Sequence, residues 1–167
     1  MVWKQHFQHL VKSRFFVVFV VIVSGWLIIQ VMNWSIGPAS PLGLKDGHFA
    51  PCSNRQNCVN SQSEDPDHAI DPITFATDPK SAQAVLKKVV LLMRGTKLVE
   101  ESGNYLRFQV TSSFFRFVDD LEFVIEANVI QVRSASRIGY SDLGVNRKRV
   151  EQIRAGFQKM NVHEKAL

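Results

Sequence analysis

The sequence lacks the short motifs by which many catalytic sites are recognised. It contains no HExxH zinc motif, no phosphate-binding P-loop and no GxSxG nucleophile turn. Only three histidines follow the long apolar run near the N-terminus: His48, His68 and His163. Ser134 and Ser136 therefore have no candidate base beside them. These absences favour a protein that works without a catalytic residue and without a cofactor.

Acidic residues are missing from the first 45 positions, where Lys4, Lys12 and Arg14 lie. This flank accounts for much of the net charge of +5, because removing its three bases from the 20 leaves 17 against 15 acids, a net +2. A domain with so small a surplus of positive charge lacks the electrostatic footprint of a nucleic-acid binder. We therefore expect no nucleic acid among the partners.

Phe15–Met32 is an apolar run of 18 residues without a charge. As a helix, at about 1.5 Å per residue, it nearly spans the hydrocarbon core of a bilayer. Basic residues precede it and none follows until Lys45, so the positive-inside rule places the N-terminus in the cytoplasm. We expect a cytoplasmic flank over residues 1–14, a single inner-membrane anchor over residues 15–34, and a domain in the periplasm or an equivalent lumen.

The anchor has one alternative and one further implication. Ala39 and Ser40 are small residues after which a signal peptide could be cleaved, but the apolar run is longer than a usual signal core, which favours retention. Ser24 and Gly25 within the run would permit the close approach of a second transmembrane helix. The expected partners are therefore the lipid bilayer and a membrane protein.

Cysteine is scarce, with only Cys52 and Cys58 in the chain. In an oxidising compartment a disulfide is the natural interpretation, and it would close a small loop. The alternative is a metal site that includes His48 and His68, but two cysteines with no second pair are weak zinc spacing. We expect a disulfide and no metal.

Beyond the anchor we expect a linker over residues 35–46, an extracytoplasmic domain over residues 47–160 and a tail over residues 161–167. Residues 42–71 are rich in turn formers and predict an ordered but irregular segment. Asp78 is a candidate N-cap for a helix over 79–94.

Two hairpins and a second helix follow. Ser102–Asn104 is typical of a hairpin turn, and Ala127–Asn128 of another. A last amphipathic helix is predicted to begin near Asp142 or Leu143, with Asn146 or Asp142 as its cap. The order of elements predicts an α+β fold, in which two helices pack on a small antiparallel sheet of about four strands.

The second hairpin has a predictable register. A turn at Ala127–Asn128 pairs Glu122 with Arg133, and it places the acids on one face and an apolar surface on the other. A slip by one residue would move the acids onto the apolar face, so the pattern itself supports this register.

This hairpin and the start of the last helix form the densest polar cluster, and three interpretations of it compete. The cluster is structural if Asp120 and Glu122 pair with arginines, Glu151 pairs with Arg147, and Arg154 is solvated. It binds an anion, a lipid headgroup or an acidic partner if the helix start and its bases face outward, although the anion could equally be the domain's own Asp119 or Asp120. It is a hydrolase site if Asp120 and Glu122 act as acid and base, but nearby arginines would pair with these carboxylates. The candidate binding residues are Asp119, Asp120, Glu122, Arg133, Arg137, Asn146, Arg147, Lys148 and Arg149.

Three stretches, "PCSNRQNCV", "FVDDLEFVI" and "VRSASRIGYSDLGVNRKRVEQIR", resemble the family catalogued as domain of unknown function 1499. The resemblance covers roughly Gly47 to Phe157. It implies an exported or membrane-tethered protein and no particular reaction. The residues themselves predict a non-catalytic accessory or assembly protein that acts by protein–protein contact at the membrane surface.

Overall fold

A computed structural model describes residues 2–38 and 41–164 of the chain. It divides into two compact units. The first runs to Ile36 and also takes in the loop tip Phe114–Arg116, and the second holds Gly37–Ser113 and the chain from Phe117 onward.

Helix α1, Val2–Ser35, is 34 residues long. Its stretch Arg14–Val31 has a mean hydropathy of 2.3 and is not buried, so the helix is long and apolar enough to cross a membrane. Length and composition of this kind also fit a signal sequence. The helix begins earlier than the predicted anchor, because the basic flank contains neither glycine nor proline to interrupt it.

The second unit is an α+β domain, as predicted, with more strands than expected. The sheet has six strands in the order β3-β8-β7-β6-β5, with β4 also paired to β8, and all its pairings are antiparallel. The predicted sheet of about four strands corresponds to its centre: β5 (Thr96–Ser102), β6 (Tyr105–Thr111), β7 (Val118–Ile125) and β8 (Val129–Ser136).

Three of the four additional strands lie in residues 42–71, which were predicted to be irregular, and the fourth follows directly after them. Two of the four form a two-stranded hairpin, and the other two add to the edge of the sheet beside β8. Each strand has only two or three residues, too few for an alternating pattern to show in the sequence. They are β1 (Leu44–Lys45), β2 (His48–Phe49), β3 (Cys58–Asn60) and β4 (Ile73–Thr74).

The predicted register of the β7–β8 hairpin is confirmed. Glu122 lies opposite Arg133, Asp120 opposite Ala135 and Ile125 opposite Ile130. Successive residues of a strand point to opposite faces, so Asp120 and Glu122 share one face while Asp119 shares the other with the apolar residues.

Helix α2, Pro79–Leu91, begins where predicted, and Ser81 N donates to Asp78 Oδ1 at 2.9 Å. It ends before the predicted Arg94, because Thr96 Oγ1 donates to the carbonyls of Val90 and Met93 at 2.9 and 2.8 Å and turns the chain. Gly95 completes the turn at φ +78°, where a Cβ would lie 2.2 Å from the Thr111 carbonyl oxygen. Only glycine fits so close an approach of two backbones.

Helix α3, Val145–Glu164, begins later than predicted. Leu143 and Gly144 have φ values of 56° and 77°, a left-handed conformation that a right-handed helix cannot include. Further along, Gly156 lets α3 approach α2 closely, since a Cβ there would lie 3.0 Å from Val89 Cγ1.

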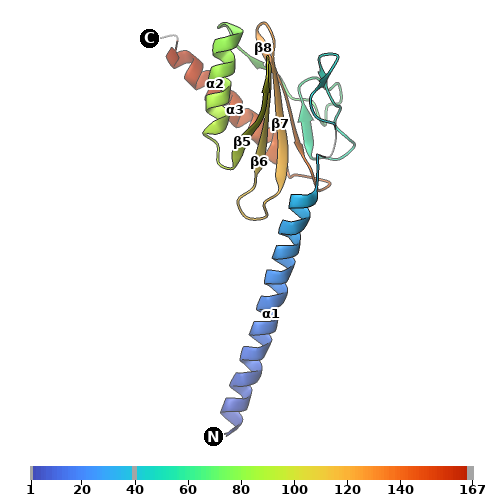
Figure 1. The fold of residues 1–167 in the computed structure, drawn as a ribbon, viewed down its shortest axis with the longest axis vertical. Helices are drawn as coiled ribbons and strands as arrows, with labels where there is room; N and C mark the ends of the chain where they lie inside the picture. Colours follow the sequence, from blue (N-terminus) through green and yellow to red (C-terminus); the bar gives the residue numbers. More distant parts are fainter. Residues whose placement is uncertain (1, 39–40, 165–167) are drawn as a thin grey trace. The chain divides into compact units, whose positions relative to one another are not determined.

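The two faces of the sheet have different covers (Figure 1). Helices α2 and α3 lie on one face and enclose the main apolar core, which includes the buried Leu86, Phe123 and Phe157. The segment that contains β1–β3 lies on the other side, where Phe49 packs with Tyr105 and Val124.

Candidate functional site

The predicted polar cluster is two networks on opposite faces of the sheet. The helix-side network joins β7 and β8 to α3, and the segment-side network lies on the face toward residues 43–63. Most of the members are buried. The helix-side network consists of Asp119, Ser134, Ser136, Asn146 and Arg149, and the segment-side network consists of Tyr105, Asp120, Glu122, Arg133 and Arg137.

In the helix-side network, Arg149 bridges the helix and the sheet. Its guanidinium donates to Asp119 Oδ2 at 2.5 Å, to Ser134 Oγ at 3.1 Å and to the Asn146 side-chain oxygen. Asn146 also donates to Ser136 Oγ at 3.0 Å and to the Asn57 carbonyl at 3.1 Å. This network therefore holds the start of α3 against β8 and connects it to Asn57, the residue before β3.

In the segment-side network, Glu122 accepts three hydrogen bonds. Arg133 Nη1 donates to Oε2 at 2.8 Å, and Tyr105 Oη and the Gly43 amide each donate to Oε1 at 2.8 Å. Glu122 is 0% exposed and Arg133 is 2% exposed. Burial raises the pKa of Tyr105 far above its ordinary value. The negative charge of Glu122 and the hydrogen bond from Tyr105 to Glu122 raise this pKa further.

Asp120 is held by a fork-shaped arginine contact. Arg137 Nε and Nη2 donate to its two oxygens at 2.9 and 3.0 Å, and Arg107 Nη1 lies 3.9 Å away. The predicted pairing of Asp120 and Glu122 with Arg137 and Arg133 is therefore present in the structure. Asp120 is 2% exposed, so solvent hardly reaches this carboxylate.

The start of α3 carries its own anion. Asp142 accepts from the Gly144 amide at 2.9 Å and from the Asn146 amide at 2.8 Å. A carboxylate in this position satisfies the open N–H groups of a helix start and complements its dipole. Of the two predicted caps, Asp142 and Asn146, it is Asp142 that caps the helix. Its carboxylate occupies the helix start, where an external anion was predicted as one alternative.

Two details of the structural interpretation are wrong. Arg147 does not pair with Glu151, because it donates to the carbonyls of Ala69 and Asp67 at 2.7 and 3.2 Å. Glu151 instead accepts from Arg154 at 2.9 Å. Arg154 is only partly exposed rather than solvated, since it also donates to the carbonyls of Pro72 and Asp71 at 2.6 and 2.5 Å.

Lys148 is the one predicted site residue with an exposed side chain. It lines a cleft of about 440 Å³ between α3, the end of α2 and the end of β6. Two residues of these sites were not predicted from the sequence: Arg94, which lines the same cleft, and Tyr105 in the segment-side network. Tyr105 could have been found, because it alternates with Leu106 and shares the polar face of its strand with Arg107.

The cysteines form the predicted disulfide, Cys52–Cys58, with Cα atoms 5.7 Å apart. Both sulfurs are thereby removed from the alternative metal site. His68 Nδ1 lies 3.0 Å from the Cys58 carbonyl oxygen, and His48 is exposed on the β1–β2 hairpin. Across residues 2–38 and 41–164 no group of three or more histidines, cysteines or acids could hold a metal ion.

Fold and site together define a class of protein. It is an α+β domain that contains a disulfide and buried ionic networks and that follows an apolar N-terminal helix in the chain. The family model described as "Protein of unknown function (DUF1499)" matches residues 48–157. The chain belongs to this family, as the resemblance implied. No curated protein and no solved structure matches it.

Proposed function

We propose that the chain is a membrane-anchored, non-catalytic accessory protein whose extracytoplasmic domain acts by contact with a membrane-protein partner. One observation carries the proposal: the acids and arginines that dominate the chemistry of the domain bind one another inside the fold. Asp119, Asp120 and Glu122 each have an arginine partner within the domain. Their role is then to hold the shape that a partner would recognise.

The hydrolase alternative fits this arrangement less well. A general acid or base must come within hydrogen-bond reach of the proton that it moves. Asp120 and Glu122 are 2% and 0% exposed, and Glu122 already accepts three hydrogen bonds. A substrate would have to displace part of the fold to reach them.

The anchor and its direction belong to the same proposal. The span Arg14–Val31 and the bases that precede it support a helix inserted with its N-terminus in the cytoplasm. The Cys52–Cys58 disulfide supports an oxidising compartment for the domain, such as the periplasm.

The anchor also offers a place for a partner helix. Ser24 and Gly25 lie within the span, and a Cβ built at Gly25 meets nothing within 4 Å in the described chain. Small residues of this kind let two transmembrane helices approach closely. We propose that the partner contacts this face of α1.

In-membrane photocrosslinking of the full chain tests the proposal. A photoreactive residue in place of Ile28, about one turn from Ser24, should give a discrete adduct with one membrane protein. The matched control is Val23, which helical geometry places on a different face. The same membrane protein should co-purify at fixed stoichiometry in mild detergent. Indistinguishable smears at both positions, with a lone monomer in every detergent, would count against the proposal.

A second experiment separates the accessory role from catalysis. Asp120→Asn is made in the full chain, and both partner recovery and the cellular phenotype of a deletion are measured. An accessory protein should keep its function whenever folding and partner recovery are kept. Loss of function with folding and partner recovery intact would favour an enzyme that uses Asp120.

A further inference from the structure

The cleft of about 440 Å³ beside Lys148, which we name the α2–α3 cleft, lies wholly within the second compact unit. Met93 and Arg94 line it from just beyond the end of α2, Lys148 and Arg149 line it from the first two turns of α3, and Val110 lines it from the end of β6. Val110 belongs to the main apolar core, so the cleft lies on the face of the sheet that carries the two helices. Because α2 ends about one turn earlier than its sequence pattern predicts, the space beyond its end stays open.

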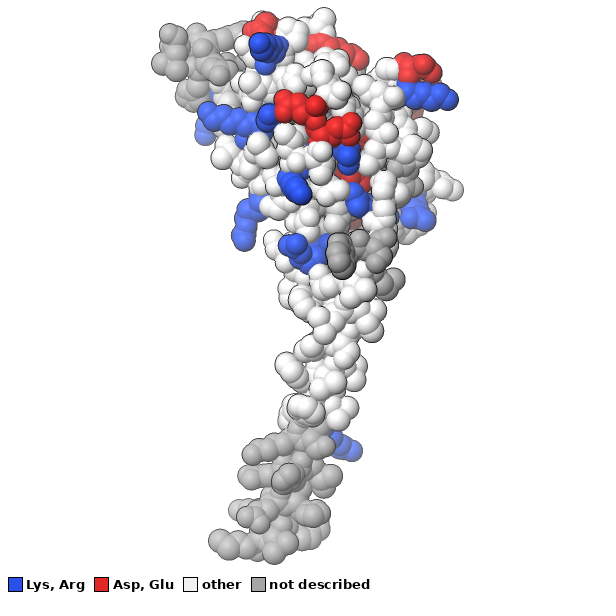
Figure 2. Space-filling view, viewed as in Figure 1, with Lys and Arg blue, Asp and Glu red and all other residues white. Residues whose placement is uncertain are grey.

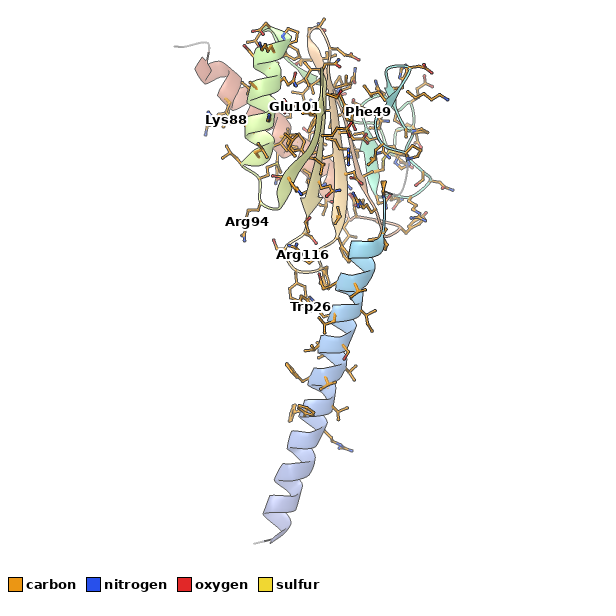
Figure 3. The ribbon with its side chains drawn as sticks, in the orientation of Figure 1. Trp26, Phe49, Lys88, Arg94, Glu101 and Arg116 are labelled. Carbon is orange, nitrogen blue, oxygen red and sulfur yellow. A yellow bond between two sulfur atoms is a disulfide. The ribbon has the colours of Figure 1, made fainter. Side chains whose placement is uncertain are left out.

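The charge around the α2–α3 cleft is of one sign. Arg94, Lys148 and Arg149 line it, and no acid does. Arg149 is balanced by Asp119, but Arg94 and Lys148 have no ion-pair partner among the side chains that the structure describes. In the view of Figure 2 the visible acids gather higher on the domain than Arg94, which Figure 3 labels just beyond the end of α2. Two positive charges therefore meet at the cleft without an internal counter-charge.

Arg149 brings a buried donor to the same cleft. The residue is 8% exposed, and its two Nη atoms donate to Asp119, Ser134 and Asn146. Its Nε has no acceptor within the described part of the chain and is not fully enclosed. Buried N–H groups are nearly always paired, with protein, with water or with a ligand. An acceptor bound in the cleft would pair with this one.

Lys148 lies where a helix disfavours a cation. It is the fourth residue of α3, and the dipole of a helix makes its first turn a place for negative charge. Asp142 already caps the backbone there, so the helix start gains nothing from the ammonium group. A residue that breaks a local rule without a structural gain is expected at functional sites.

The walls of the cleft indicate the class of ligand. Met93, Val110 and Val145 supply apolar surface, and Thr111 and Ser113 supply hydroxyl groups. A volume of about 440 Å³ is within the range of small-molecule sites and exceeds what one inorganic anion needs. Guanidinium, ammonium and hydroxyl donors approach from several directions, which suits the oxygens of a phosphate better than the two oxygens of a carboxylate.

We infer that the α2–α3 cleft binds the phosphate group of a small phosphoester that carries an apolar substituent. Arg94, Lys148 and the Nε of Arg149 donate to the phosphate oxygens, and Met93 and Val145 contact the substituent. Free phosphoesters and the headgroups of anionic lipids share this chemistry. The inference depends neither on the proposed anchoring of α1 nor on a protein partner, so it can fail or hold without them.

Methyl NMR of Met93 tests the site, because this methionine lines the cleft. The full chain, labelled with ¹³C-methyl methionine, is titrated with phenyl phosphate in a non-ionic detergent. The Met93 signal, assigned by its loss in Met93→Leu, should shift and saturate. The signal of Met160, which packs against the core outside the cleft, should stay in place. Benzyl alcohol, which has the ring without the phosphate, is the matched probe and should cause a much smaller shift at Met93.

Charge variants test the phosphate contact. Arg94→Gln with Lys148→Gln should weaken the affinity for phenyl phosphate about tenfold. Lys80→Gln with Lys159→Gln removes two exposed bases elsewhere, whose distance and screening should keep the change below about twofold. Val145→Glu places an acid in the cleft at the start of α3, where a helix favours one. This variant should lose binding while its melting temperature is kept or raised, which separates binding from folding.

Nanodiscs distinguish the two sources of the phosphate. The full chain is placed in discs of phosphatidylcholine alone or of phosphatidylcholine with phosphatidylglycerol, and phenyl phosphate is then added. A Met93 shift caused by phosphatidylglycerol itself, and lost in Arg94→Gln with Lys148→Gln, would identify a lipid headgroup. A Met93 shift that requires phenyl phosphate in both kinds of disc would identify a soluble phosphoester.

Three outcomes would overturn the inference. Equal Met93 shifts with benzyl alcohol and phenyl phosphate would show that the cleft accepts apolar molecules regardless of charge. An unchanged affinity in Arg94→Gln with Lys148→Gln would show that these bases do not bind the phosphate. Shifts of the same size at Met93 and Met160 would show adsorption over the whole domain instead of binding in the cleft.

Discussion

On one face of the sheet, α2 and α3 enclose an apolar core, whereas on the other an irregular segment lies over a buried ionic network. A helix satisfies its own backbone hydrogen bonds and needs only apolar side chains to pack well. An irregular segment brings amides and carbonyls that require partners. Here the domain supplies those partners as side chains, since Glu122 accepts from the Gly43 amide and Arg147 donates to the Ala69 carbonyl.

The comparison suggests what the charged cluster is for. Asn57 Nδ2 donates to the Gly139 carbonyl at 2.7 Å, and Arg154 donates to the carbonyl of Pro72. Polar side chains thus satisfy the backbone groups of the irregular segment, whereas on the helix-covered face regular secondary structure satisfies them. The free energy of unfolding should therefore fall when a single polar group is removed from the segment-covered face. On the helix-covered face it should fall when the volume of an apolar side chain is removed.

The largest effect is expected from Arg133→Met on the segment-covered face. It leaves Glu122 buried without a counter-charge, and breaking a buried pair in this way costs about 3–5 kcal/mol. Thermal or denaturant unfolding of the detergent-solubilised chain measures it. Glu100→Gln removes an exposed ion-pair partner of Arg107 and should cost less than about 1 kcal/mol. A loss for Arg133→Met as small as that of the control would show that the buried pair does not hold this face.

Next in size is Leu86→Ala on the helix-covered face. Leu86 is 0% exposed, and removing its side chain should cost about 3 kcal/mol through lost burial and the cavity that remains. The same unfolding experiment measures it. Leu92→Ala, at the exposed end of α2, should change stability by no more than about 0.5 kcal/mol. Equal effects of the two variants would contradict the position of the core.

Removal of the disulfide should have an intermediate effect. Cys52→Ser with Cys58→Ser opens a loop with a sequence separation of 6, and the loss of so short a cross-link costs about 2 kcal/mol. Amide exchange should rise first in β1–β3, before it rises in α2 and α3. Uniform exchange over the whole domain would mean that the segment does not open separately.

Tyr105→Phe should cost about 1–2 kcal/mol, because Glu122 loses one of its donors. It should also alter the alkaline stability profile. The pKa of Tyr105 is raised in the fold above its ordinary 10.0, so its contribution is complete below pH 10 and is lost as the pH rises above that value. The Tyr105→Phe variant should therefore lose less stability than the unaltered chain as the pH rises above 10. The variant Tyr140→Phe, at an exposed position, should lose as much stability as the unaltered chain.

The smallest effect is expected at the start of α2. Hydrogen bonds from Ser81 lower the pKa of Asp78 below its ordinary 3.8, so the cap stabilises above that pH and its contribution is lost as the pH falls through the lowered value. Asp78→Ala should lower the melting temperature slightly near neutral pH and hardly at all in strong acid. Asp78→Asn should keep the cap and lose this pH dependence. A melting temperature for Asp78→Ala equal to that of the unaltered chain at neutral pH would contradict the cap.

The helix-covered face could be predicted from the sequence because it follows periodic patterns. Alternating apolar residues set the β7–β8 register, and this register also predicted the contacts Glu122–Arg133 and Asp120–Arg137 on the opposite, segment-covered face. The cap at Asp78 is also a local signal. Each of these features depends on residues that are near one another in the sequence or opposite one another in a hairpin.

The other contacts of the irregular segment could not be predicted in the same way. Its contacts join side chains to backbone groups, such as Arg147 to the Ala69 carbonyl, and a carbonyl has no signature in the sequence. On the helix-covered face, the Arg149–Asp119 pair joins residues 30 positions apart on two elements whose packing no periodicity fixes, so Asp119 was only one of several candidate anions. The short strands β1–β4 depend on these same contacts.

The seven residues between Ser35 and Gly43 have a consequence for affinity. If α1 spans a bilayer, the eight Cα-to-Cα steps from Ser35 to Gly43 confine the domain within about 28 Å of one point on it, and the domain then meets that surface at an effective concentration on the order of 10 mM. A surface with a dissociation constant near 1 mM, too weak to hold a free protein, would then be occupied most of the time.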